Sequence, residues 1–198
     1  STFGCHFELL EFGTLKKLRD NITKAEINEK IREFNNVFKV SPDCAIEEIE
    51  RAARTSVAFD KLVERYKLGS LAYYYEGDGD LDYENIVSSV IPGLTLLTGN
   101  NVPVAGELEI KNVQAMKIMD ILGCGGSFSE FYAMDFEDDI VLLGHDGPAH
   151  FKIADGKVGL VPLPVYHGKP GKGLSIQMKV VNGPITLLSV CQNNSGKI

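Results

Sequence analysis

The sequence predicts an α/β fold in two parts: a parallel-sheet α/β domain over residues 1–125 and a β-rich domain over residues 126–198. In the first part, apolar residues recur at helical spacing and short apolar runs lie between the helices, an alternation that favours a parallel sheet. After Gly125-Gly126 the helical period disappears and short β-rich runs follow one another. These runs indicate an antiparallel sheet, which we interpret as the start of a β-barrel-like domain.

Helix-start signals and apolar spacing define the elements of the first part. Thr23 and Glu26 form a capping-box pattern, and the helix after them keeps apolar spacing as far as Phe38. Ser41-Pro42 supplies a cap and a first-turn proline for a longer helix. In chain order we expect helices over 23–38, 41–66, 83–97 (kinked at Pro92) and 110–122, with strands over 71–75 and 102–105.

The second part consists of short runs rich in β-branched and aromatic residues, separated by turn dipeptides. Asp155-Gly156 and Asn182-Gly183 are strong hairpin signals. The turn residues 193–196 have only two residues after them, so we expect the β-rich domain to be truncated at its C-terminus. The predicted strands cover 128–136, 140–143, 151–154, 158–162, 174–181 and 185–192.

Composition excludes several classes of partner. The net charge is −7, the pI is near 5.1, and the basic residues are dispersed, which argues against nucleic acid. No apolar run approaches the ~18 residues of a membrane span. The four cysteines are widely spaced and no secretion signal precedes them. Reduced thiols and a cytoplasmic location are therefore expected.

Three short motifs carry the candidate chemistry: AGE with Glu107, SFSE with Glu130, and GHDGPAH with His145. Each motif falls at the end of a predicted strand, so two carboxylates and an imidazole can converge there. Carboxylate oxygens suit Mn²⁺ or Mg²⁺, and an imidazole shifts the preference toward Mn²⁺. A zinc site would more often use cysteine, and no CxxC or CxxH pair is present.

Each of these residues also has a simpler interpretation. Glu107 could be a first-turn acid that complements a helix dipole, with Glu109 as a rival for its role. Glu130 could be an outward-facing strand carboxylate, and His145 a loop histidine. His167 and Lys169, in YHGK, could approach a sugar hydroxyl or could belong to a solvated loop.

The same motifs resemble the catalytic part of the L-arabinose/L-fucose isomerase superfamily, nearest to its L-arabinose isomerase-like branch. The resemblance runs from Val102 to Gln192 and includes VYHGK and GPITLLSVCQ. It implies that Glu107 and Glu130 are an acid/base pair and metal ligands, with His145 as a third ligand of Mn²⁺. Family members are longer and add a further histidine ligand near the C-terminus, so we expect this chain to be an internal part of a larger enzyme.

The reaction implied by the resemblance is the interconversion of an aldose and a ketose on an open-chain sugar, through an ene-diol intermediate. A metal ion stabilises the charge that forms when the proton next to the carbonyl leaves. We expect an oligomeric full-length isomerase, and an isolated chain with little activity. A non-catalytic sugar-binding relative and an inactive structural fragment remain as alternatives.

Overall fold

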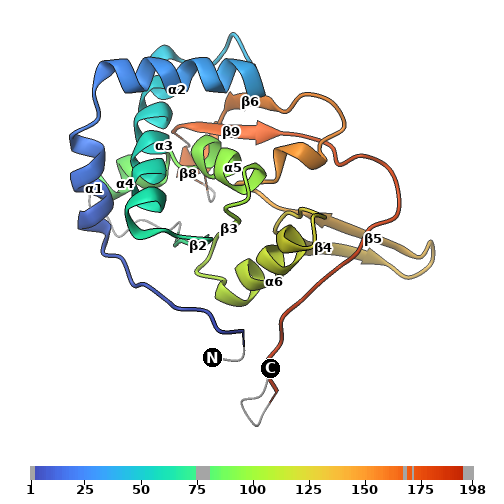
Figure 1. Cartoon of the computed structure of the whole chain (residues 1–198). Coiled ribbons are helices and arrows are strands. Elements are labelled where there is room, and N and C mark those ends of the chain that lie inside the picture. Colours follow the sequence, from blue (N-terminus) through green and yellow to red (C-terminus); the bar gives the residue numbers. More distant parts are fainter. Residues whose placement is uncertain (1–2, 75–80, 167–168, 171, 194–198) are drawn as a thin grey trace.

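The computed structural model describes residues 3–74, 81–166, 169–170 and 172–193. Figure 1 shows helices at the N-terminal side of the molecule, with strands β6 (Gly159–Pro162) and β9 (Leu174–Gln177) beside helix α5 (Ile91–Gly99). The hairpin of β4 (Glu130–Asp135) and β5 (Ile140–Gly144) extends from the opposite side. The chain is a mixed α/β protein, which confirms the predicted fold class. Its described strands form no closed barrel.

Helices α1 (Phe12–Asp20), α2 (Lys24–Val37) and α3 (Ile46–Tyr66) pack together. The capping box of α2 is confirmed: the Thr23 N–H donates to the Glu26 carboxylate at 2.8 Å and the Glu26 N–H donates to the Thr23 hydroxyl at 3.3 Å. Helix α3 begins later than predicted, because the Ser41 hydroxyl accepts from the Asp43 N–H at 3.2 Å and closes a turn instead of a helix. Helix α1 was not predicted.

The predicted helix over 83–97 is two helices, α4 (Leu81–Val87) and α5 (Ile91–Gly99). Pro92 lies in the first turn of α5, where its missing N–H costs no helix hydrogen bond, so it starts a helix and does not kink one. Every residue of α5 is buried. Close packing against α3 requires Gly93, because a Cβ there would lie 2.8 Å from Ser56.

Parallel pairing joins β2 (Leu71–Ala72) to β3 (Val104–Ala105), as predicted for the first part. A second sheet has the order β1-β6-β9, formed by β1 (Lys39–Val40), β6 (Gly159–Pro162) and β9 (Leu174–Gln177). Strand β1 pairs parallel with β6, and β6 pairs antiparallel with β9. The two predicted domains therefore share a sheet, because β1 comes from one and its partners come from the other.

The rest of the β-rich part is partly as predicted. Antiparallel pairs join β4 (Glu130–Asp135) to β5 (Ile140–Gly144), and β7 (Val165–Tyr166) to β8 (Lys169–Pro170). Residues 151–154 were wrongly predicted as a strand: Phe151–Ile153 is a 3₁₀ turn, with Phe151 wedged where a Cβ at Gly99 of α5 would lie 2.2 Å away. Residues 185–192 are not a strand either, because they have no pairing partner among the described residues.

The largest core cluster also draws on both predicted parts. Phe34 and Phe38 from the first part and Leu160 and Leu174 from the second are all fully buried in it. Helix α6 (Ile110–Ile121) contributes to a smaller cluster of Ala105, Val113, Met116 and Phe128. This smaller cluster lies beneath the candidate site and fixes the base of β4.

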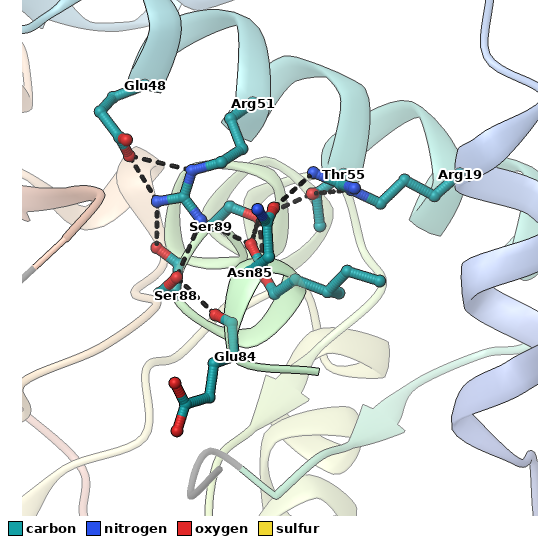
Figure 2. Close-up of polar contacts among 9 residues, drawn as sticks. Arg19, Glu48, Arg51, Thr55, Glu84, Asn85, Ser88 and Ser89 are labelled. Carbon is teal, nitrogen blue, oxygen red and sulfur yellow. Dashed lines mark hydrogen bonds and ion pairs between the residues drawn. The ribbon is translucent and has the colours of Figure 1, made fainter. Parts of the chain in front are cut away.

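A polar network ties α1, α3 and α4 together (Figure 2). The Arg51 guanidinium donates to the Glu48 carboxylate, to the Ser88 hydroxyl at 2.8 Å and to the backbone carbonyl of Asn85. Arg19 donates to the Thr55 hydroxyl at 2.9 Å and to the Asn85 side chain at 3.1 Å. Arg51 thus caps backbone carbonyls at the end of α4.

Among the described residues, none of the helices combines the length and the apolar character that crossing a membrane requires.

Candidate metal and proton-transfer site

Glu107 lies in a tight turn between β3 and α6. The Glu109 N–H donates to the Gly106 carbonyl at 3.0 Å, and the Leu108 N–H donates to the Tyr73 carbonyl at 2.9 Å. The two central residues, Glu107 and Leu108, have φ values of 60° and 54°, the pattern of a type I′ turn. The AGE motif therefore forms a turn that follows the buried strand β3 and precedes α6.

The backbone of this turn is strained. A type I′ turn favours Asn and Gly at its central positions, whereas Glu and Leu occupy them here. Each left-handed residue with a large side chain costs of order 1–3 kcal/mol, and such strain is concentrated at functional sites. The strain is an observation of this structure that favours a functional role for Glu107 over that of an ordinary first-turn acid.

Glu130 begins β4 and is half-buried. Its backbone pairs with Gly144, the last residue of β5, so Glu130 lies next to the residue that precedes His145. The register of the hairpin thus brings SFSE and GHDGPAH together.

His145 is half-buried, and its ring is held from two sides. Nδ1 lies 3.0 Å from the carbonyl oxygen of Pro148, a contact in which Nδ1 must carry the proton and donate. The ring also packs edge-on against Phe128, with centroids 4.5 Å apart. In this tautomer Nε2 keeps its lone pair, and it lies 3.9 Å from the position of a Cβ at Gly106, beside the Glu107 turn.

Two glycines of GHDGPAH make room for aromatic rings. A Cβ at Gly147 would lie 2.6 Å from His145 Cε1, and a Cβ at Gly144 would lie 2.6 Å from Tyr132 Cε2. Both distances are too short for any other residue without movement of a ring. The spacing of the glycines around His145 is therefore a packing requirement of the site.

Tyr132 is a site residue that the sequence analysis missed. The pairing of β4 with β5 shifts register between Phe131 and Ala133, so Tyr132 occupies a bulge. Bulges commonly redirect a side chain beside an active site. Burial and the charges of Glu130, Asp146 and Glu107 raise the pKa of the Tyr132 hydroxyl. In an unbroken strand the two-residue period would place Tyr132 on the face of Glu130, which is the signal that could have indicated it.

The electrostatic surroundings of His145 link it to Glu107. Burial lowers the pKa of the His145 imidazole, while the Pro148 carbonyl and the charges of Asp146 and Glu107 oppose that shift. The net direction keeps the ring neutral at lower pH than a free imidazole. A neutral ring with a fixed tautomer is the form in which histidine binds metal ions.

The structure places only some of the candidate residues at the site around Glu107, Glu130 and His145. His167 lies outside the described residues, and Lys169 belongs to β8, which lies well apart from the β4–β5 hairpin in Figure 1. Glu109 is the N-cap residue of α6. Within the described ranges, no group of three or more His, Cys, Asp or Glu side chains is close enough to hold a metal ion as it stands.

His150 lies against the glycine-rich loop that precedes Phe128. It is buried, its N–H donates to the Ser127 hydroxyl at 3.3 Å, and its Nε2 lies 2.9 Å from the position of a Cβ at Gly125. His150 thereby fixes the glycine-rich loop that precedes Phe128. The Pro148 carbonyl orients the His145 ring.

No family model matches this sequence, and comparison with curated proteins gives no match.

Proposed function

We propose that the chain carries the metal-binding and proton-transfer residues of a Mn²⁺-dependent isomerase that interconverts open-chain aldoses and ketoses of the L-arabinose or L-fucose type. One observation carries the proposal. The imidazole of His145 is held on the Pro148 carbonyl by a hydrogen bond from Nδ1, and its Nε2 lies beside the strained Glu107 turn. Glu130 pairs with Gly144, the residue before His145. The resemblance of the three motifs to that superfamily agrees with this arrangement.

The residues fit a divalent ion of the proposed kind. Glu107 and Glu130 offer carboxylate oxygens, and His145 offers one neutral nitrogen, a mixed donor set that suits Mn²⁺. The hydrogen bond from His145 Nδ1–H to the Pro148 carbonyl is the outer contact that ligating histidines commonly have. Glu107, Glu130 and His145 would hold the ion.

The chemistry assigned to the two glutamates is proton transfer. A divalent ion here supplies positive charge beside the carbonyl and hydroxyl oxygens of the sugar. One carboxylate removes the proton from C2 and returns it to C1, while the other carries the C2 hydroxyl proton to the C1 oxygen. The reaction is thereby balanced with no external oxidant or reductant. Either glutamate can fill either role.

Tyr132 is assigned a supporting role beside the two carboxylates. Its raised pKa keeps the hydroxyl protonated, so it can donate a hydrogen bond to a sugar oxygen. The small-molecule sugar is the partner that this site requires. A cytoplasmic location is part of the same proposal.

A second candidate function is sugar binding without turnover. It is favoured by the finding that no three-ligand group is assembled among the described residues. Without a firmly held ion the carboxylates could bind sugar hydroxyls but could not stabilise charge on the sugar carbonyl. Both candidates therefore predict sugar binding, and only the isomerase predicts proton exchange.

Hydrogen–deuterium exchange at the sugar tests the proposal more sensitively than net conversion. In D₂O with Mn²⁺, we expect slow loss of the C2 proton signal of L-arabinose or L-fucose by NMR. Glu130→Gln should abolish it, since loss of a general acid or base typically costs ~10²–10⁴-fold in rate. The matched control Glu137→Gln alters an exposed acid at the tip of the hairpin. Exchange that survives in Glu130→Gln, or sugar binding with no exchange in the unaltered chain, would reject the isomerase proposal.

A further inference from the structure

The β4–β5 hairpin exposes apolar side chains along both of its strands. Phe131, Tyr132 and Phe136 are 60%, 52% and 87% exposed, and they are joined by Met134, Ile140, Val141 and Leu142. A fully buried aromatic side chain removes ~150–250 Å² from water. The three aromatic residues alone therefore expose about 400 Å², roughly half of what one partner contributes to a standard protein interface.

The hairpin also lacks a third strand. Among the described residues β4 and β5 pair only with each other, and a two-stranded hairpin is marginally stable in water. The extra residue Tyr132 bulges β4, whereas β5 contributes no extra residue to the pairing. The regular edge of β5 is thus the place where another strand can add.

A segment of this same chain has the properties of that strand. Residues 181–189 are exposed and belong to no helix or strand, with Ile185 and Leu187 at 65% and 60%, and they include the strand-like sequence ITLLS. Both ends of the segment are anchored: the Val181 N–H donates to the Ile153 carbonyl at 3.0 Å, and Val190 is buried. The segment is therefore held out as a loop with its apolar side chains in water.

Charge favours pairing of the hairpin with the exposed segment over pairing of two hairpins. Residues 130–144 contain five acids, Glu130, Asp135, Glu137, Asp138 and Asp139, and no basic residue. Two hairpins that paired with each other would bring like charges together. Residues 182–193 contain no charged residue, so they can pair with the hairpin without that repulsion.

We propose that residues 182–189 of one copy of this chain add as a strand to β5 of a second copy, and that the exchange is mutual. Within a single chain neither element covers the other, since both are exposed. A two-fold dimer contains the contact twice, which doubles the apolar area removed from water. The dimer does not rest on the proposed catalytic function, although the hairpin also carries Glu130 and Tyr132 of the candidate site.

A complementation experiment tests the exchange. Leu142→Glu damages the accepting hairpin, and Leu187→Glu damages the inserted strand. Each variant alone loses both contacts of the dimer and should be monomeric by light scattering coupled to size exclusion. An equimolar mixture should recover a heterodimer, because the intact segment of the Leu142→Glu chain meets the intact hairpin of the Leu187→Glu chain.

Control measurements distinguish strand exchange from misfolding and from other ways of forming a dimer. Both leucines are exposed in the single chain, so circular dichroism should show unchanged folding in either variant. Ile46→Glu alters a residue that is 70% exposed at the start of α3, and it should leave the dimer intact. A monomeric unaltered chain would overturn the proposal. So would a dimer that survives Leu187→Glu, which indicates hairpin-to-hairpin pairing, or a mixture that stays monomeric.

Discussion

The ring of His145 packs edge-on against the ring of Phe128, with centroids 4.5 Å apart and an interplanar angle of 73°. Phe128 is itself buried in the cluster of Ala105, Val113 and Met116 below β4. The orientation of the imidazole is therefore set by the apolar core as well as by the Pro148 carbonyl. The contact between Phe128 and His145 therefore links the apolar core to a candidate metal ligand.

Phe128→Leu should retain most of the apolar burial but remove the aromatic contact. We expect a stability loss of about 1 kcal/mol, because an edge-to-face aromatic pair adds ~0.5–1.5 kcal/mol beyond its buried area. Mn²⁺ affinity should fall together with it, since the ring of His145 loses one of its two supports. Denaturant unfolding and a Mn²⁺ titration measure the two effects. Unchanged affinity in the variant would show that Phe128 supports the core alone.

Gly147→Ala should disturb the site more than its small size suggests. The added methyl would lie 2.6 Å from His145 Cε1, so the ring must leave its place on the Pro148 carbonyl. The NMR signals of His145 should shift, and Mn²⁺ binding should weaken. Gly159→Ala is the matched control, because its methyl would meet Gln177 at an ordinary 3.6 Å. Equal effects of the two substitutions would contradict the role of Gly147.

Sequence reasoning succeeded where the signal was local. The capping box at Thr23 and Glu26 predicted the start of α2 correctly, and apolar spacing found α6 to within one residue at its end. The pairing of SFSE with GHDGPAH was also within reach, since SFSE lies at the start of one predicted strand and GHDGPAH follows the next predicted strand. These features depend on neighbours that are close in the chain.

The failures involve partners far away in the chain. No local pattern says that β1 pairs with β6, whose residues follow some 120 positions later, so the shared core of the two predicted parts was missed. Phe151 has a strand-like neighbourhood, but the space at Gly99 of α5 holds it in a 3₁₀ turn. The bulge at Tyr132 depends on the register of two strands, which a single sequence does not fix.

Arg51 should be important for stability and unimportant for the site. Its side chain is only 9% exposed, and it connects the Glu48 carboxylate to the end of α4 (Figure 2). Arg51→Met should lower stability by ~2–4 kcal/mol, because it leaves a half-buried carboxylate and backbone carbonyls without their donor. Thermal unfolding measures the loss. Lys24→Met removes an exposed ion pair with Glu50 and should cost less than about 1 kcal/mol.

Glu26 gives the stability of the protein a specific pH dependence. Hydrogen bonds from Lys61 and Thr23 lower the pKa of its carboxyl from 4.5 to about 2. Because the folded-state pKa is depressed, the stabilisation is complete above 4.5 and is lost as the pH falls toward about 2. Glu26→Gln should therefore melt at a lower temperature than the unaltered chain near neutral pH, and the difference should shrink through this window. A difference in melting temperature that stays constant with pH would contradict this assignment.

Glu107, Glu130 and His145 are proposed to share one Mn²⁺ ion. Paramagnetic broadening of backbone amide signals tests it even when the ion exchanges rapidly, as we expect with three ligands from the chain. Substoichiometric Mn²⁺ should broaden the amides around Gly106, Glu130 and His145 together, and Glu130→Gln should weaken all three effects. Broadening confined to the acidic hairpin tip at Glu137, Asp138 and Asp139, or broadening at only one of the three motifs, would contradict the account.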